Sequence, residues 1–179
     1  MTTGKPRAFA QAAFLAAALL ALPFFLSRRW RVARRVIIMA HASEIFPFLN
    51  EPRNWPRWTD WNRREQVSFS YEGPDSGAGA TQAWSSRNMA GAMRLVQSVE
   101  NEQVVYHADL GRKGHPHPVD GILTLEPLGE ATRVTWFSRW DSGPNPYARY
   151  RSLLAKWIGG RDFAAGLRNL KELVETKAS

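Results

Sequence analysis

The chain has 179 residues and no cysteine, and its 24 Lys and Arg residues against 16 Asp and Glu residues give a formal net charge of +8. Seven of the basic residues lie in the first 35 positions, which contain no acid, so the rest of the chain is nearly neutral. A nearly neutral domain argues against nucleic-acid binding, and the lack of cysteine excludes disulfides and thiolate metal sites.

The N-terminal segment has the composition of a membrane helix. Residues 8–26 form an apolar run of 19 residues that only Gln11 interrupts. A helix of that length extends roughly 28 Å, which is close to the hydrocarbon thickness of a bilayer. We therefore predict a transmembrane anchor over residues 1–29, with Arg28, Arg29 and Arg31 on its basic flank.

Two alternatives compete with a spanning anchor. A cleaved signal peptide is disfavoured because the run ends without a small-x-small cleavage site and arginines follow it. A helix buried in a protein core or lying in the membrane interface is the other, although the apolar residues run all the way round this segment. Five arginines follow the run against Lys5, Arg7 and the amino terminus before it. The positive-inside rule then predicts a single-pass membrane protein with its C-terminal domain in the cytoplasm.

Residues 30–179 are enough for one domain with one core. A first strand rich in Val and Ile is expected over 30–40, followed by a short helix with Ser43 as its N-cap. A second short helix or turn is expected over 53–61. Alternating apolar residues then predict strands near 66–71, 81–87, 93–99, 103–110, 119–127 and 131–140. Their short connections favour an antiparallel meander.

The last segment, 145–178, has apolar residues at steps of three and four and is predicted to be one long helix. Gly159 and Gly160 interrupt this pattern and indicate a kink or a close backbone approach. A sheet that buries one face must be covered, and only this helix is long enough to cover it. We therefore expect an α+β fold in which the sheet curls around the C-terminal helix and leaves a cavity between them.

This order of elements, with its residues, resembles the START-like (SRPBCC) superfamily, in its polyketide cyclase/dehydrase and lipid-transport branch with the Bet v 1-like helix-grip fold. The matching stretches are 36–46, 54–61, 77–80 leading to Trp84, 132–136 and 163–171. His41 departs from the family, which often has proline before the first helix. The resemblance implies a START-like domain over 30–179 with a cavity for an apolar ligand, and it does not imply catalysis.

Aromatic residues are the candidates for lining that cavity, because indole rings offer a large apolar area to a ligand. The candidates are Trp55, Trp58, Trp61, Trp84, Met93, Trp136, Trp140 and Trp157. The competing interpretation is ordinary core packing, with the first three rings pinning the short helices to the sheet. The expected partner is a membrane lipid or an apolar small molecule, with no cofactor, no metal and no nucleic acid.

Polar chemistry has weaker support in the sequence. His107 and Asp109 alternate onto one face of a strand, and both point to solvent if Tyr106 faces inward. His115 and His117 alone make an incomplete metal site. We therefore predict no catalytic residue. A cyclase, dehydratase or hydrolase acting in the same cavity is one alternative function, and a structural membrane-associated protein without an open cavity is another.

Overall fold

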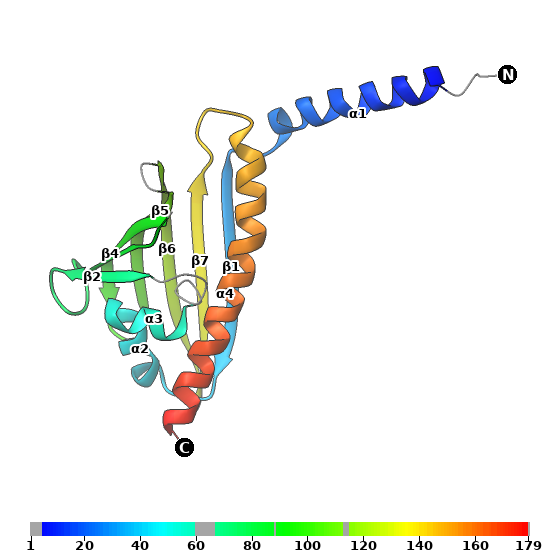
Figure 1. The fold of residues 1–179 in the computed structure, drawn as a ribbon. Coiled ribbons are helices and arrows are strands. Elements are labelled where there is room, and N and C mark those ends of the chain that lie inside the picture. Colours follow the sequence, from blue (N-terminus) through cyan, green and yellow to red (C-terminus); the bar gives the residue numbers. More distant parts are fainter. Residues whose placement is uncertain (1–4, 60–66, 88, 113–114, 179) are drawn as a thin grey trace.

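The computed structural model describes residues 5–59, 67–87, 89–112 and 115–178. Its strands form one antiparallel sheet in the order β1-β7-β6-β5-β4-β3-β2. Strands β2 to β7 form a meander, and β1 pairs with β7 at one edge of it. The strands are β1 (Arg29–Ile38), β2 (Ser68–Glu72), β3 (Thr81–Ser85), β4 (Met89–Val99), β5 (Gln103–Arg112), β6 (His115–Leu128) and β7 (Ala131–Asp141). The sheet and the helix that crosses it are seen in Figure 1. The predicted α+β fold with a long C-terminal helix is confirmed.

Helices cover one face of this sheet, which we call the inner face. The helical elements are α1 (Lys5–Phe25), α2 (Ala42–Asn50), η1 (Pro52–Asn54), α3 (Trp55–Trp58) and α4 (Ala148–Ala178). The long helix α4 packs mainly along β1, while α2 and α3 lie beside its C-terminal half (Figure 1). Side chains from α2, α3, α4 and the sheet join in one hydrophobic core.

The N-terminal helix α1 extends away from the sheet, and its apolar side chains are exposed (Figure 1). Within the described residues, no helix combines the length and apolarity needed to cross a membrane, so the prediction of a transmembrane anchor is not supported. Of the predicted flanking arginines, Arg29 and Arg31 lie in β1 with exposed side chains. Arg28 precedes that strand and forms an ion pair of 2.7 Å with Asp141.

Two local predictions differ from the structure. The N-cap of α2 is His41 rather than Ser43, because the Glu44 carboxylate accepts the backbone N–H of His41 and closes a capping box. β6 begins at His115 rather than near residue 119, since β5 and β6 stay paired as far as Arg112 and His115. The pairing of β6 with β7 begins only at Asp120, so the prolines before it lie where β6 has a neighbour on one side.

The glycine pair in α4 permits a close approach to the sheet. Gly160 is buried, and a Cβ placed on it would lie 2.5 Å from the Arg34 guanidinium and 3.6 Å from Val32, both on β1. Gly159 has open space around it. The helix is continuous through both, so close backbone approach, one of the two predicted explanations, applies at Gly160.

Candidate functional site

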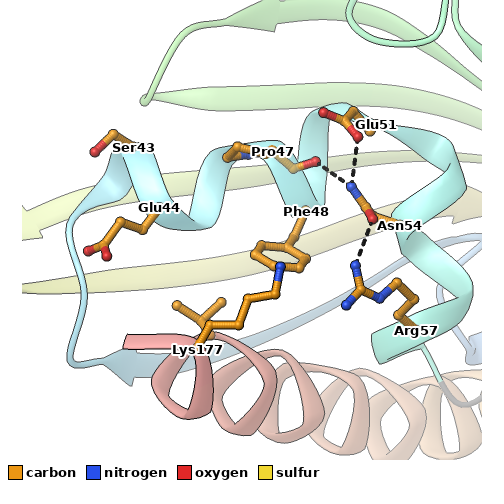
Figure 2. Close-up of a pocket in the computed structure, with 9 residues that line it drawn as sticks. Ser43, Glu44, Pro47, Phe48, Glu51, Asn54, Arg57 and Lys177 are labelled. Atoms are coloured by element: carbon orange, nitrogen blue, oxygen red, sulfur yellow. Dashed lines mark hydrogen bonds between the residues drawn. The ribbon is translucent and has the colours of Figure 1, made fainter. Parts of the chain in front are cut away.

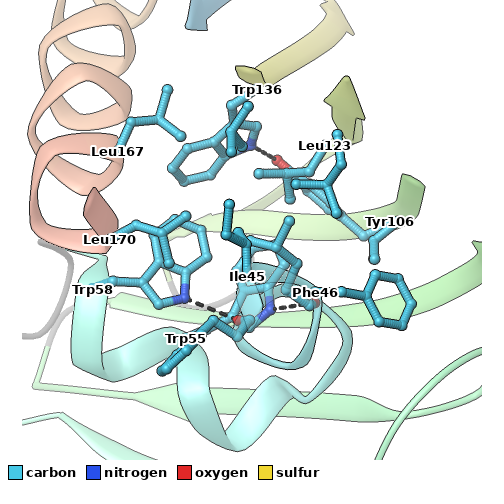
Figure 3. Close-up of a cluster of buried hydrophobic side chains, with 14 of the residues drawn as sticks. Ile45, Phe46, Trp55, Trp58, Tyr106, Leu123, Trp136, Leu167 and Leu170 are labelled. Atoms are coloured by element: carbon cyan, nitrogen blue, oxygen red, sulfur yellow. Dashed lines mark hydrogen bonds between the residues drawn. The ribbon is translucent and has the colours of Figure 1, made fainter. Parts of the chain in front are cut away.

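The core between the sheet and the C-terminal half of α4 is built from closely packed aromatic rings, which we call the tryptophan cluster (Figure 3). Trp55, Trp58 and Trp136 are completely buried. The ring centroids of Trp55 and Trp58 are 5.2 Å apart, and those of Trp58 and Trp136 are also 5.2 Å apart. Phe163 of α4 stacks on Trp136 at 3.8 Å, with the planes 4° apart. The space predicted to be a cavity is filled here by side chains.

Hydrogen bonds fix two of these indoles. The Trp55 Nε1–H donates to the Leu49 carbonyl at 2.9 Å, and the Trp58 Nε1–H donates to the Phe48 carbonyl at 3.1 Å. Both acceptors lie at the end of α2, so the rings tie α3 to α2 while they pack under α4 (Figure 3). This placement agrees with the interpretation of these rings as core. Their role in ligand binding stays a prediction.

A buried polar network lies beside the cluster on the inner face. The Trp136 Nε1–H donates to the Tyr106 hydroxyl at 2.8 Å, and that hydroxyl lies 2.9 Å from the Ser138 hydroxyl. Tyr106 and Ser138 face Gly121 from the strands on either side of it, and the Tyr106 ring occupies the space that a side chain at Gly121 would need. Burial raises the pKa of Tyr106 from 10.0 to about 12. The phenol is therefore neutral, and its hydroxyl takes part in the network through hydrogen bonds.

Coverage of the inner face falls toward the end of the sheet where α4 begins. Five neighbouring strands each place a buried residue near the middle and a half-buried one, also facing inward, closer to that end. The buried residues are Gln82, Met93, Ala108, Leu123 and Ser138. The half-buried residues are Trp84, Gly91, Leu110, Val119 and Trp140, which we call the open end. This step in exposure on five strands makes the open end the candidate site for an apolar ligand.

Two indoles dominate the open end. Trp84 of β3 lies flat over Gly91 of β4, where a side chain would collide with its ring. The Trp140 Nε1–H of β7 donates to the Ser152 hydroxyl of α4 at 3.2 Å, and Ser142 donates to the same hydroxyl at 2.9 Å. The open end is therefore bounded by α4 on one side and by the β3–β4 ribbon on the other.

The remaining candidates lie elsewhere. Met93 is buried in the core near the open end, and Trp157 lies on the outward side of α4 with 60% of its surface exposed. Trp61 lies outside the described residues. The structure thus separates the seven candidates that it describes into four core side chains, two open-end rings and one surface ring, although the sequence presented them as one set.

His107 and Asp109, the two polar candidates on β5, lie on the outer face. Tyr106 faces inward, so His107 and Asp109 point to solvent. The His107 Nδ1 lies 3.0 Å from an Asp120 carboxylate oxygen, and Arg139 binds the other oxygen at 3.2 Å. These two partners, His107 first, hold the pKa of Asp120 below its usual value. The described residues contain no cluster of three or more side chains suited to a metal ion.

A second concavity lies between α2, α3 and the C-terminal end of α4 (Figure 2). It has a volume of about 410 Å³, and its lining is Ser43, Glu44, Pro47, Phe48, Glu51, Asn54, Arg57, Val174 and Lys177. The Lys177 ammonium lies 5.0 Å from the centroid of the Phe48 ring. The Asn54 amide donates to Glu51 at 2.9 Å and accepts from Arg57 at 3.2 Å. Charged side chains line this groove, and several of the lining side chains hydrogen-bond to one another.

The sequence analysis did not identify this groove, because its lining comes from three segments that carry no motif. Its mixed charges suit a polar ligand, and its side chains already satisfy one another. The open end offers half-buried indoles instead. For an apolar ligand, the open end is therefore the stronger of the two sites.

A family model described as polyketide cyclase / dehydrase and lipid transport matches residues 29–175. Among solved structures, protein CV1439 from Chromobacterium violaceum is similar at a TM-score of 0.56 and 16% identity, over 84% of this chain and 99% of that one. A protein from Arthrobacter aurescens matches at a TM-score of 0.62 and 13% identity, over 82% and 86%. Ara h 8.0201 matches at 0.57 and 11%, over 83% and 99%. No curated protein matches. At these identities the structural likeness shows the fold.

Proposed function

Since the chain belongs to the polyketide cyclase/dehydrase and lipid-transport family, we propose that it binds a hydrophobic small molecule or lipid at the open end of the inner face. The step in exposure from Ser138 to Trp140, repeated on the neighbouring strands, is the observation that carries this proposal. A ligand there covers half-buried apolar surface, and each Å² of that surface contributes roughly 25 cal/mol when water leaves it.

The site also favours a particular shape of ligand. Trp84 on β3 and Trp140 on β7 lie at opposite sides of the open end, so an extended apolar body that reaches across the strands between them can contact both indoles. The hydroxyls of Tyr106 and Ser138 lie just beyond, at the boundary of the filled core. A polar group at the buried end of the ligand can hydrogen-bond there without leaving an unpaired atom.

We further propose that α1 keeps this domain at a membrane, with the domain in the cytoplasm. Large apolar side chains of α1 are exposed, among them Phe14, Leu19 and Phe25, and arginines follow the helix. The chain enters β1 from α1 at the open end of the sheet, which puts the site near a source of apolar ligands (Figure 1). Tethering then raises the effective concentration of ligand at the site.

An enzyme of the cyclase or dehydratase type is the alternative function. The observation that favours it is the buried hydroxyl pair of Tyr106 and Ser138 on the inner face. A phenol with a pKa of about 12 is a hydrogen-bond donor rather than a base at neutral pH, so it would stabilise developing negative charge on a substrate oxygen. Turnover of a ring-forming substrate that Tyr106→Phe abolishes, with ligand binding retained, would favour this alternative.

Native mass spectrometry of the detergent-extracted full chain, followed by organic extraction, tests ligand binding. We expect a co-purifying apolar molecule, and we expect Trp84→Ala and Trp140→Ala to lower its occupancy severalfold. Phe137→Ala is the matched control, because it removes a ring from the opposite face of β7. The proposal is contradicted if the protein carries no co-purifying molecule and also fails to bind a dansyl-labelled fatty acid.

Cell fractionation tests the attachment. Replacement of Phe14, Leu19 and Leu20 by serine should release the chain from membranes, whereas serine at Ile37, an exposed apolar residue of β1, should not. Protease added to intact cells should leave the domain uncut. Digestion from outside would contradict the cytoplasmic location.

A further inference from the structure

The first half of α4 presents an exposed apolar face. Leu154 and Trp157 are 58% and 60% exposed, and Leu153 and Ile158 beside them are also exposed. Ser152 and Gly160 are buried and mark the side of α4 that faces the sheet, while the residues between them, 153–158, are exposed. Four large exposed apolar side chains on one side of two helical turns form a contiguous patch, which in a folded domain marks an interaction surface.

Basic residues outnumber acidic ones around this patch. Residues 142–162 contain four basic residues and one acid, Asp162. Arg151 lies one turn before Leu154 and Arg161 one turn after Trp157, and both are exposed. The Arg161 guanidinium lies 4.8 Å from the centre of the Trp157 ring. An indole beside cations, on a helix with leucine and isoleucine next to it, is the composition of a surface that lies at the level of lipid headgroups.

The patch is joined to α1 by specific contacts. The Arg149 guanidinium donates to the carbonyls of Pro23, Phe24 and Leu26 at 2.7, 3.1 and 3.0 Å. The Tyr150 hydroxyl donates to the Leu19 carbonyl, and Phe24 meets Tyr147 edge to face. The first turns of α4 therefore hold the C-terminal end of α1, and the two apolar surfaces lie at the same end of the molecule (Figure 1).

A second copy of the chain is a poor occupant for this patch. In a symmetric dimer, Arg151 and Arg161 of one patch would face the same two cations of its partner, and Asp162 is the single acid within residues 142–162 that could offset them. An anionic bilayer surface complements both the charge and the apolar side chains. We propose that the outward face of α4, formed by Leu153, Leu154, Trp157 and Ile158 with Arg151 and Arg161, is a second membrane contact that requires anionic lipid.

This inference rests on the proposed attachment and extends it with an orientation. With α1 and α4 both on the bilayer, the open end of the inner face lies toward the membrane, and the turn between β6 and β7 lies away from it. An apolar ligand would then pass between membrane and site with a short path through water.

A single fluorescent label tests the contact in the full chain, because the protein has no cysteine of its own. Leu154→Cys carries an environment-sensitive dye, and Leu128→Cys, in the β6–β7 turn at the far end, is the matched control. The labelled proteins are mixed with phosphatidylcholine vesicles that contain or lack phosphatidylglycerol. We expect the dye at position 154 to shift to the blue and to become severalfold less accessible to acrylamide when phosphatidylglycerol is present, whereas the dye at position 128 stays in water.

The charge requirement has its own variant. Changing Arg151 and Arg161 together to glutamine should remove most of the difference between the two lipid compositions. Co-flotation with vesicles while the dye at 154 remains fully quenchable would overturn the α4 contact and leave the attachment by α1 intact. Loss of co-flotation itself would overturn both. Protection of the dye without vesicles, rising with protein concentration, would assign the patch to a second copy instead.

Discussion

The two ends of the inner face are built from the same strands and differ in what covers them. At one end, α2, α3 and the C-terminal half of α4 close over the tryptophan cluster, and the three central indoles have no exposed surface. At the other, Trp84 and Trp140 lie on the same face of the sheet and are half-buried. The difference teaches that aromatic content alone does not mark a binding site in this fold. Coverage by the helices decides which rings stabilise the domain and which are left for a ligand.

Truncating one ring at each end gives the largest contrast. Trp58→Ala opens a cavity in the filled end, and we expect it to lower the free energy of unfolding by about 3–5 kcal/mol. Trp84→Ala removes a half-buried ring and should cost only about 1–2 kcal/mol, while it weakens binding of the dansyl-labelled fatty acid. Urea denaturation and a fluorescence titration measure the two effects. Equal losses of stability would mean that the two ends are not different.

Gly121→Ala tests how tightly the boundary between the ends is packed. A methyl group at Gly121 occupies the position of the Tyr106 ring, so we expect a loss of about 3 kcal/mol from overpacking. Denaturant unfolding measures it. Adding Tyr106→Leu to the Gly121→Ala variant should recover part of the loss, because the two positions are coupled. Strict additivity of the two changes would contradict the contact.

Tyr106→Phe removes the hydroxyl that accepts from Trp136 and hydrogen-bonds to Ser138, and should cost about 1–3 kcal/mol. The unfolded chain loses the Tyr106 proton near pH 10.0, while the folded chain keeps it to about pH 12. The wild type should therefore lose stability as pH rises through this window, with the contribution complete below it. Unfolding followed from pH 9 to pH 12 should show a shallower decline for Tyr106→Phe. Parallel declines would place the titrating group elsewhere.

The glycine pair supplies the smallest and most local comparison. Gly159→Ala meets open space within a helix, so we expect a gain of about 0.5–1 kcal/mol. Gly160→Ala, one residue along, displaces the Arg34 guanidinium and should gain less or nothing. Thermal unfolding of both variants measures the difference. A larger gain at Gly160 would show that the close approach to β1 is not a constraint.

The fold could be predicted from the sequence more completely than the candidate site could. Alternation placed Tyr106 and His107 on opposite faces of one strand, and the structure has Tyr106 buried and His107 exposed. It could not rank Trp58 above Trp84 in burial, because coverage depends on where a helix from the far end of the chain lies. Gly160 shows the same limit, since its close approach involves Arg34, a residue 126 positions earlier.

The contact of Arg149 with two carbonyls of α1 and with that of Leu26, just after the helix, has a mechanical consequence. One guanidinium joins the projecting helix to the first turn of the helix that covers the sheet. The same turns of α4 hold Trp140 through Ser152. A change in the tilt of α1 must either break those bonds or move the first turns of α4 at the open end. The orientation of α1 and the position of α4 beside the open end are therefore mechanically coupled.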